Sequence, residues 1–243
     1  MKNLAIIKIA GKGTRIHTNV PKQFVEVHGK PVFIYTLEAF EKSNLTDAIS
    51  VVTSKEYLDF VKDACKKYNI TKAKFFSLGD PKYGNGSTFN GYKVALDNDY
   101  FPDYIISHDG VRALITPEDI DGCIEKCIDS DNGISQMSKE LVGSILFKNN
   151  HWEVINRNEV LELATPIVLK NKIFDRLYTY YQTATDEQKE KWFGLDTMFM
   201  EEFAHCITPY ISDKINFKIT TDSDLQFFKD LIEMRFTNNE SAN

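Results

Sequence analysis

Two glycines and two basic side chains follow the first apolar run of the chain. The stretch IAGKGTRIHTNVPKQF covers residues 9–24, and Gly11 and Gly13 stand close together at its start. Arg15 and Lys22 lie seven residues apart in the same stretch. Small residues let backbone N–H groups face an anion, and the two cations add positive charge to the same loop. This combination is typical of a site for an anion with several charges, such as a triphosphate.

The two common phosphate-binding motifs do not fit this stretch. The P-loop requires Gly-Lys-Ser/Thr after a longer spacing, and the dinucleotide fingerprint requires a third glycine where this chain has Ile16. A glycine turn with two solvated basic residues therefore stays open as an alternative to an anion site.

Three further clusters contain residue types that suit a binding site. They are GNGSTFNG at 84–91, SHDGVR at 107–112 with Asp109 just past an apolar run, and NFKITTDSDL at 216–225 with Lys218. In a parallel sheet, ligands bind beyond the carboxyl ends of the strands. The glycine-rich stretches and SHDG follow such ends, so we expect them to meet at one edge of a sheet.

The elements that must position these clusters alternate between strand and helix. Apolar runs predict strands at 4–10, 48–54, 73–79 and 103–110. Helical spacing predicts helices at 30–43, 55–69, 86–98 and 116–130, the last with Thr116 as its N-cap. This order predicts an α/β fold, with a Rossmann-like, mostly parallel sheet and helices on both faces.

The pattern changes in the second half of the chain. The segment GSILFKNNHWEVINR at 143–157 alternates on both sides of two asparagines and predicts a β-hairpin, either an arm that packs on another subunit or a flap on its own domain. Helices are predicted at 170–182 and 196–206, and a strand followed by a long helix at 215–236. We expect one domain, residues 1–243, with 141–160 as a protruding β-arm.

Composition limits the classes of partner and the compartment. The 243-residue chain carries a net charge of −6, which argues against a nucleic-acid partner. Its four cysteines lack the second ligand pair of a zinc site, so buried thiols are expected instead. We find no secretory signal and no apolar stretch long enough to span a bilayer. The sequence thus predicts a cytoplasmic protein without a membrane partner.

Several of these stretches resemble the cytidylyltransferases that make CDP-polyols, namely the 2-C-methyl-D-erythritol 4-phosphate and ribitol-5-phosphate cytidylyltransferases. The similar blocks are AGKGTRI, PKQF, SHDGVR, ATPIVLK, LDTMFME and INFKITTDSDL, which keep the family's order along nearly the whole chain. The resemblance implies a nucleotidyltransferase, GT-A-like fold. It also implies transfer of CMP from CTP to a polyol or sugar phosphate, with release of pyrophosphate.

The resemblance further implies a role for individual residues. The nucleotide-binding residues would be Ala10, Gly11, Lys12, Gly13, Thr14, Gly86, Ser87 and Asp109. The catalytic residues would be Arg15, Lys22 and Lys218, and the acceptor-binding residues Arg157 and Thr165. Asp109 would also help to place Mg²⁺. Arg157 would reach from the hairpin into the site of a partner subunit, which implies a homodimer.

The chain departs from the family pattern at two places that bear on the substrate. Gly84 replaces an arginine three residues before the matched serine, with Lys82 as the nearest cation, and SKELVGS lacks an Asp-Thr pair of the erythritol-phosphate enzymes. These differences favour ribitol 5-phosphate or a related polyol phosphate, used for cell-surface polymers. The alternatives are 2-C-methyl-D-erythritol 4-phosphate, for isoprenoid synthesis, and a diverged relative that binds nucleotide without catalysis.

Overall fold

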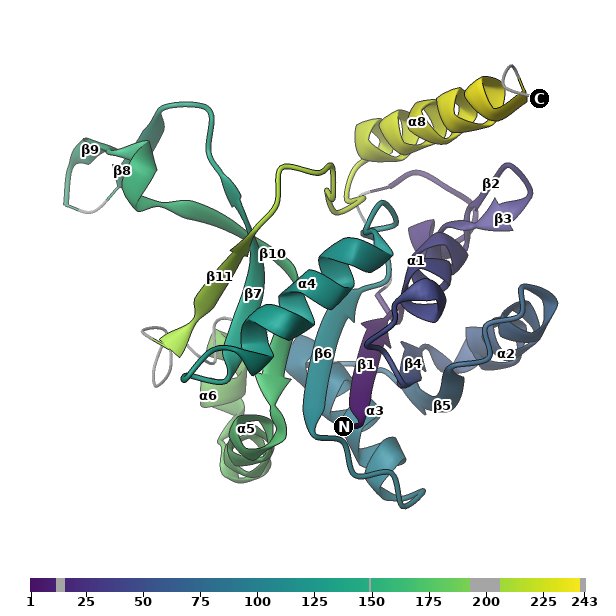
Figure 1. Ribbon diagram of the computed structural model, residues 1–243, viewed down its shortest axis with the longest axis horizontal. Coiled ribbons are helices and arrows are strands. Elements are labelled where there is room, and N and C mark those ends of the chain that lie inside the picture. Colours follow the sequence, from purple (N-terminus) through teal and green to yellow (C-terminus); the bar gives the residue numbers. More distant parts are fainter. Residues whose placement is uncertain (12–15, 149, 193–205, 241–243) are drawn as a thin grey trace.

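In a computed structural model, which describes residues 1–11, 16–148, 150–192 and 206–240, a seven-stranded sheet forms the centre of the protein (Figure 1). The strand order is β11-β7-β10-β6-β1-β4-β5. The four predicted strands are mutually parallel neighbours: β1 (Asn3–Lys8), β4 (Ala48–Thr53), β5 (Ala73–Leu78) and β6 (Tyr104–Asp109). Only β10 among the described strands of this sheet runs against its neighbours. The predicted mostly parallel α/β sheet is confirmed.

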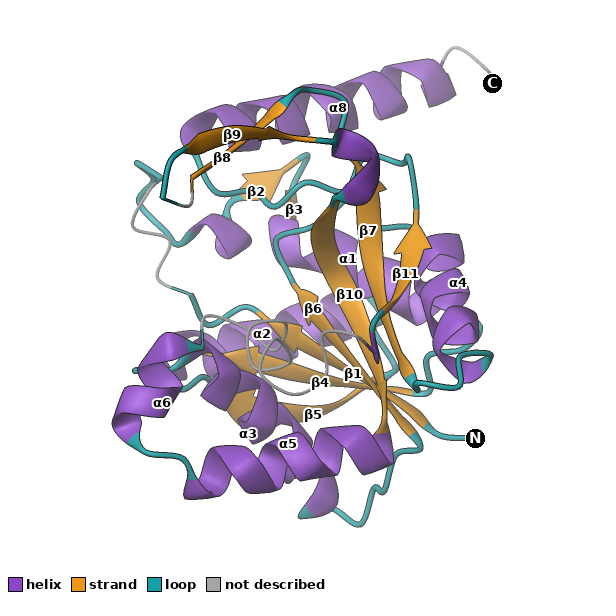
Figure 2. Ribbon diagram, turned by 90° about the vertical axis from the view of Figure 1, so that its left-hand side faces the viewer, coloured by secondary structure: helices purple, strands orange, loops and turns teal. Residues whose placement is uncertain are grey.

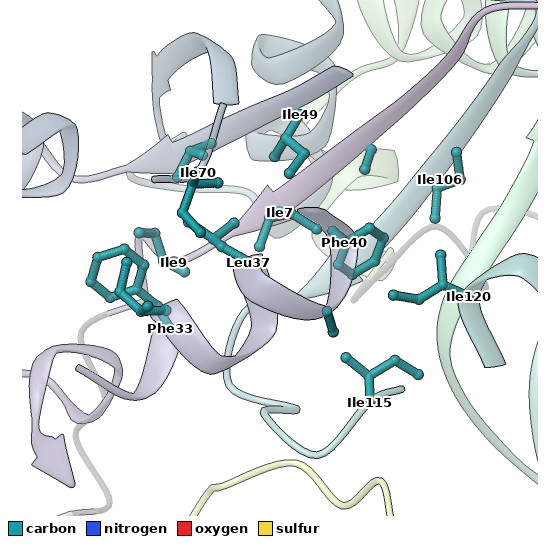
Figure 3. Close-up of a cluster of buried hydrophobic side chains, with 14 of the residues drawn as sticks. Ile7, Ile9, Phe33, Leu37, Phe40, Ile49, Ile70, Ile106, Ile115 and Ile120 are labelled. Atoms are coloured by element: carbon teal, nitrogen blue, oxygen red, sulfur yellow. The ribbon is translucent and has the colours of Figure 1, made fainter. Parts of the chain in front are cut away.

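Helices cover both faces of this sheet. Successive side chains of a strand point to opposite faces, so the apolar central strands present apolar side chains on both faces. Ala5 and Ile7 of β1 face one hydrophobic cluster, which is drawn in Figure 3, whereas Leu4 and Ile6 face another. The first cluster includes residues of α1 (Val32–Lys42), α2 (Leu58–Lys67) and α4 (Pro117–Ile128). The second includes residues of α3 (Gly84–Leu96) and α5 (Asn171–Thr183), on the other side of the sheet (Figure 2).

Side chains cap the starts of two helices, one of them at Thr116 as the sequence predicts. Thr116 Oγ1 accepts a hydrogen bond from the backbone N–H of Asp119 at 3.2 Å, directly before α4. Before α8 (Asp222–Glu240), the carboxylate of Asp224 accepts the N–H groups of Thr220 and Thr221 at 2.9 and 2.8 Å. In return, Thr221 Oγ1 accepts the backbone N–H of Asp224 at 3.3 Å, so both helices have a first-turn donor satisfied by a Thr side chain.

The second half of the sheet differs from the sequence prediction. Three strands were not predicted: β7 (Ile134–Glu140), β10 (Leu161–Lys170) and β11 (Thr208–Ile211). The prediction of a strand at the start of 215–236 is wrong, because residues 215–220 are irregular and Ile219 N–H donates to the carbonyl of Val111 rather than to a strand ladder. The helix α6 (Asp186–Lys191) was also missed, and the helix predicted at 196–206 lies outside the described residues except for its last position.

Short elements complete the described chain. They are the two-stranded pair β2 (Glu26–Val27) and β3 (Lys30–Pro31), and the 3₁₀ helices at Lys22–Phe24, Lys55–Tyr57 and Arg157–Glu159. Cys65, Cys123 and Cys127 are buried, as predicted, whereas Cys206 is partly exposed. Within the described ranges, we find no helix with the length and apolarity needed to cross a bilayer.

The predicted hairpin is confirmed and projects beyond the sheet (Figure 1). It consists of β8 (Ile145–Lys148) and β9 (Trp152–Ile155), which pair antiparallel. Large apolar side chains on this hairpin are exposed, namely Leu146, Phe147, Trp152 and Val154. Its role as a contact between subunits stays a prediction, as does the organisation into one domain with residues 141–160 as an arm.

Candidate active site

The carboxyl ends of β1 and β6 bring a lysine and a carboxylate together. Lys8 and Asp109 are the last residues of these parallel strands and stand opposite each other in the register. The distance from Lys8 Nζ to Asp109 Oδ1 is 3.4 Å. The chain leads from β1 to β4 on one side and returns to β6 on the other, so this pair lies at the topological switch point, where open α/β sheets bind ligands.

Two later segments add their side chains to Asp109. Lys218 Nζ lies 3.0 Å from Asp109 Oδ2, and Arg112 Nε lies 3.8 Å from the same oxygen. The backbone N–H of Asp109 donates to Thr165 Oγ1 at 3.2 Å. The structure therefore brings together three of the predicted residues, Asp109, Lys218 and Thr165, from three separate parts of the chain.

Asn216 fixes the segment that carries Lys218. Its side-chain amide donates to the carbonyl of Thr165 at 3.0 Å, and its own carbonyl accepts from Arg112 Nη1 at 2.9 Å. The irregular backbone at 215–220 thus follows the strand ends rather than adding to the sheet. This path explains how a lysine near the end of the sequence reaches the end of β6.

The cations around Asp109 keep its carboxylate ionised. Burial alone would raise the pKa of Asp109, but Lys8, Lys218 and Arg112 outweigh that effect and hold the pKa well below its ordinary value. The neighbouring His108 behaves differently, because complete burial lowers its pKa to about 3 and keeps the ring neutral at pH 7. Its Nε2 lies 3.5 Å from the carbonyl of Arg112, in the loop that follows β6.

The described residues around Asp109 do not fit a divalent ion held by the protein itself. Mg²⁺ prefers several oxygen ligands, usually from carboxylates and phosphates. Among residues 1–11, 16–148, 150–192 and 206–240, no group of three or more His, Cys, Asp and Glu side chains is placed to hold a metal. Asp109 is instead surrounded by cations. The metal-binding role of Asp109 stays a prediction.

A second group of predicted residues gathers where β1 and β5 end. A Cβ atom on Gly79 would lie 2.3 Å from Cβ of Ala10 and 3.2 Å from Ser87 Oγ, so Gly79 lies against both residues. Ser87 Oγ also accepts the backbone N–H of Asp80 at 2.9 Å. A Cβ on Gly86 would lie 2.2 Å from Asp80 Oδ2. Asn85, Gly86, Ser87 and Thr88 at the start of α3 are buried, and the Asp80 carboxylate lies beside Gly86.

Gln23 connects this group to the glycine loop. Its side-chain amide donates to the carbonyl of Ile9 at 2.7 Å and to that of Gly11 at 2.8 Å, and the residue is 2% exposed. Lys22, directly before it, begins a 3₁₀ helix. The pKa of Asp224 lies below its ordinary value. Burial raises this pKa, but hydrogen bonds from Thr220 and Thr221 and the charge of Lys22 outweigh that effect, so Lys22 lies near the start of α8.

Some predicted site residues are not placed in either group. Lys12, Gly13, Thr14 and Arg15 lie outside the described residues. Arg157 Nη1 donates to the carbonyl of Val142 at 2.6 Å, a contact within the arm. Lys82, the nearest cation to Gly84, pairs with Asp186 Oδ2 at 2.9 Å and with Glu190 Oε1 at 3.8 Å, so it faces α6.

Four residues of the site were missed by the sequence prediction, namely Lys8, Gln23, Gly79 and Asp80. A signal existed for two of them. Lys8 is a charged residue within an otherwise apolar run, and Gln23 belongs to the PKQF stretch. The contacts of Gly79 and Asp80 depend on how α3 returns to the sheet, which local sequence does not reveal.

Comparison with known proteins gives one consistent family. The model of the IspD family, described as 2-C-methyl-D-erythritol 4-phosphate cytidylyltransferase, matches residues 3–233. A ribitol-5-phosphate cytidylyltransferase of Streptococcus agalactiae is 29% identical over 239 residues, which covers 97% of both chains. A 2-C-methyl-D-erythritol 4-phosphate cytidylyltransferase of Lachnospira eligens is 28% identical over 230 residues, 92% of this chain and 96% of that protein.

A solved structure supports the fold independently. The crystal structure of 4-diphosphocytidyl-2C-methyl-D-erythritol synthase from Anaerococcus prevotii matches with a TM-score of 0.75 and 23% identity, and the match covers 96% of each chain. At this identity the likeness concerns the fold alone.

Proposed function

The chain belongs to the IspD family of cytidylyltransferases, and from this premise we propose that it transfers CMP from CTP to the phosphate of a polyol or sugar phosphate. A phosphate oxygen of the acceptor forms a bond to the α-phosphorus of CTP. The bond between that phosphorus and the oxygen bridging to the β-phosphate breaks, and pyrophosphate leaves. The products are a CDP-polyol or CDP-sugar and pyrophosphate.

The observation that carries this proposal is the set of cations held at the strand ends by Asp109. Lys218 Nζ is fixed 3.0 Å from its carboxylate, next to the strand that leads into the glycine loop. Phosphoryl transfer needs positioning and charge stabilisation more than covalent help from the protein. Lys218, Lys22 and Arg15 would neutralise charge on the α-phosphate and on the leaving pyrophosphate. Of these, Arg15 lies outside the described residues.

The nucleotide would lie over the group formed by Ala10, Gly79, Gly86 and Ser87. These small residues lie close together beside the start of α3, and backbone N–H groups at a helix start suit phosphate or base oxygens. Gln23 holds the carbonyls of Ile9 and Gly11. This arrangement supports a role of the glycine loop in binding the triphosphate.

For the acceptor we propose ribitol 5-phosphate or a related polyol phosphate, consumed in cell-surface polymer synthesis. Thr165 lies beside Asp109, so it can reach an acceptor phosphate there. The relative from Streptococcus agalactiae supports ribitol 5-phosphate, whereas the one from Lachnospira eligens supports the alternative, 2-C-methyl-D-erythritol 4-phosphate.

Three further features belong to the same proposal. The enzyme would act as a homodimer through the arm, whose exposed apolar side chains would become buried and whose Arg157 would reach the partner's acceptor site. Mg²⁺ would reduce the charge of the triphosphate and arrive with the nucleotide. We place the reaction in the cytoplasm, where reducing conditions keep the thiols free.

The test is pyrophosphate release from CTP and Mg²⁺ with a panel of acceptors. The panel contains ribitol 5-phosphate, 2-C-methyl-D-erythritol 4-phosphate, glycerol phosphate and several sugar phosphates. We expect release with ribitol 5-phosphate or a related polyol phosphate, and loss of release in Lys22→Ala. Binding of CTP without pyrophosphate release from any acceptor would contradict the proposal and favour the non-catalytic alternative. That alternative is supported by the ion pair of Lys82 with Asp186, because Lys82 is the nearest cation to Gly84, which replaces the family's arginine.

A further inference from the structure

Lys8 is placed at the site by the register of the sheet. It ends β1 directly opposite Asp109 at the end of β6, and its Nζ lies 3.4 Å from Asp109 Oδ1. Its side chain is only 22% exposed, so the ammonium group is held at the strand ends rather than extended into solvent. Neither the proposed transfer of CMP nor the resemblance gives this lysine a role.

Both oxygens of the Asp109 carboxylate face cations. Lys8 is next to Oδ1, and Lys218 and Arg112 are next to Oδ2, at 3.0 and 3.8 Å. Three cations face one carboxylate, so this point of the site has an excess of two positive charges, although the whole chain has a net charge of −6. Such a local excess attracts anions and repels free metal ions.

A divalent ion bound to Asp109 would have to replace these cations. An ion on Oδ1 would lie beside the ammonium of Lys8, and one on Oδ2 beside that of Lys218. The described residues supply no further group of ligands to offset that repulsion. The Asp109 carboxylate therefore positions the side chains of Lys8 and Lys218 in the nucleotide-free protein.

We propose that Lys8 is a phosphate-binding residue that blocks direct metal binding at Asp109 and, with Lys218, forms a site for a polyphosphate anion whose binding requires no metal ion held by the protein. The inference rests on the proposed cytidylyl transfer, in which the polyphosphate is the triphosphate of CTP. A divalent ion then enters the site already bound to the nucleotide. Asp109 keeps the two ammonium groups in place until the phosphates arrive.

The first experiment measures Mn²⁺ binding to the nucleotide-free protein by electron paramagnetic resonance. We expect wild type to bind Mn²⁺ weakly, and Lys8→Met to bind it at least about tenfold tighter because one neighbouring positive charge is gone. Adding Asp109→Asn to Lys8→Met should remove the gained site. Equal Mn²⁺ binding by wild type and Lys8→Met would overturn the proposal.

The second experiment measures inorganic tripolyphosphate binding by calorimetry in the presence of EDTA. Lys8→Met should weaken binding about tenfold or more, and Lys8→Arg should restore most of it because the charge returns. Unchanged affinity in Lys8→Met would overturn the proposal. Lys8→Gln serves as a second neutral variant if Lys8→Met does not fold.

A matched lysine elsewhere controls for the loss of a half-buried ion pair. Lys30 is also 22% exposed and pairs with Glu38 at 2.8 Å, between β3 and α1. Lys30→Met should change neither Mn²⁺ nor tripolyphosphate binding. Neither measurement needs turnover, so both test the role of Lys8 separately from the proposed function. Absence of pyrophosphate release from every acceptor contradicts only the proposed cytidylyl transfer. Unchanged ligand binding by Lys8→Met contradicts only the role of Lys8.

Discussion

Lys218 Nζ lies 3.0 Å from Asp109 Oδ2, although Asp109 ends a central strand and Lys218 lies in an irregular segment just before the last helix. The carboxylate fixes the position of a side chain that is otherwise 44% exposed. A long, flexible lysine held in this way is ready for a phosphate without first losing its rotamer freedom.

Removing the charge of Lys218 should therefore affect turnover more than folding. For Lys218→Gln we expect kcat/KM for pyrophosphate release to fall by about 100-fold or more, because one group that stabilises the transition state is lost. The melting temperature should change little, since the pair is partly exposed. A kcat/KM within a factor of about three of wild type would argue against contact between Lys218 and the reacting phosphates.

Gln23→Glu should weaken CTP binding. The substitution keeps the shape but removes the two N–H donors that hold the carbonyls of Ile9 and Gly11. We expect KM for CTP to rise about tenfold and the free energy of unfolding to fall by roughly 1–3 kcal/mol. Steady-state kinetics and urea denaturation measure the two effects.

Asn3 provides the control for Gln23. It is equally buried, at 2% exposed, and its amide donates to the carbonyl of Leu45 at 2.7 Å, at the opposite end of the same strand β1. Asn3→Asp should reduce stability without changing KM for CTP. If both variants raise KM equally, Gln23 acts only through general stability.

Gly79→Ala should also raise KM for CTP. The added Cβ would lie 2.3 Å from Cβ of Ala10, so the backbone after β5 and the backbone after β1 must move apart. Overpacking of this kind costs roughly 1–3 kcal/mol of stability. Gly143→Ala is the control, because a Cβ there would meet nothing within 4 Å. Calorimetric CTP binding that is unchanged in Gly79→Ala would place the nucleotide away from this contact.

His108 should make folding stability depend on pH. Its folded pKa is about 3 because of burial, and the unfolded pKa is about 6.5. Between these values the unfolded chain binds a proton and the folded protein does not. The free energy of unfolding should therefore fall as pH falls from about 6.5, by at most about 1.4 kcal/mol per pH unit.

Urea denaturation between pH 7.5 and 4.5 measures this slope, with the carboxylates still ionised through most of the range. His108→Gln should flatten it, whereas His151→Gln, at an exposed position, should not. A slope that His108→Gln leaves unchanged would assign the pH dependence to another group.

The arm can be tested by mixing two inactive variants. If Arg157 completes the partner's site, Arg157→Ala and Lys218→Gln are each deficient, but a mixed dimer contains one site with both residues intact. Reassembly of an equal mixture should restore about a quarter of wild-type activity. No recovery, with mixed dimers demonstrated by differential tags, would place Arg157 at its own subunit's site or at none.

Exposed apolar side chains on the hairpin predict the interface itself. Trp152 is 59% exposed and Val154 is 73% exposed. Trp152→Glu should shift the protein from dimer to monomer in sedimentation velocity and reduce acceptor use, because a charge would then lie in an apolar contact. A wild-type monomer at the enzyme's working concentration would contradict the dimer.

The sequence by itself determined the first half of the fold. Alternating apolar runs and helical spacing from β1 to α4 depend on local periodicity, and the cap at Thr116 depends on neighbours three residues away. The hairpin was recognisable for the same reason. Motif resemblance identified Asp109, Lys218 and Thr165 as site residues, and the structure places them side by side.

Only the tertiary structure decided the rest, because it depends on contacts between distant segments. Strands β7, β10 and β11 gain their partners from remote parts of the chain, and Ile219 bonds to Val111 instead of forming a strand. Lys8 meets Asp109 only through the register of two parallel strands. A lysine within an apolar run has no local signal for its partner, so its position at the site became visible only when the strands were paired.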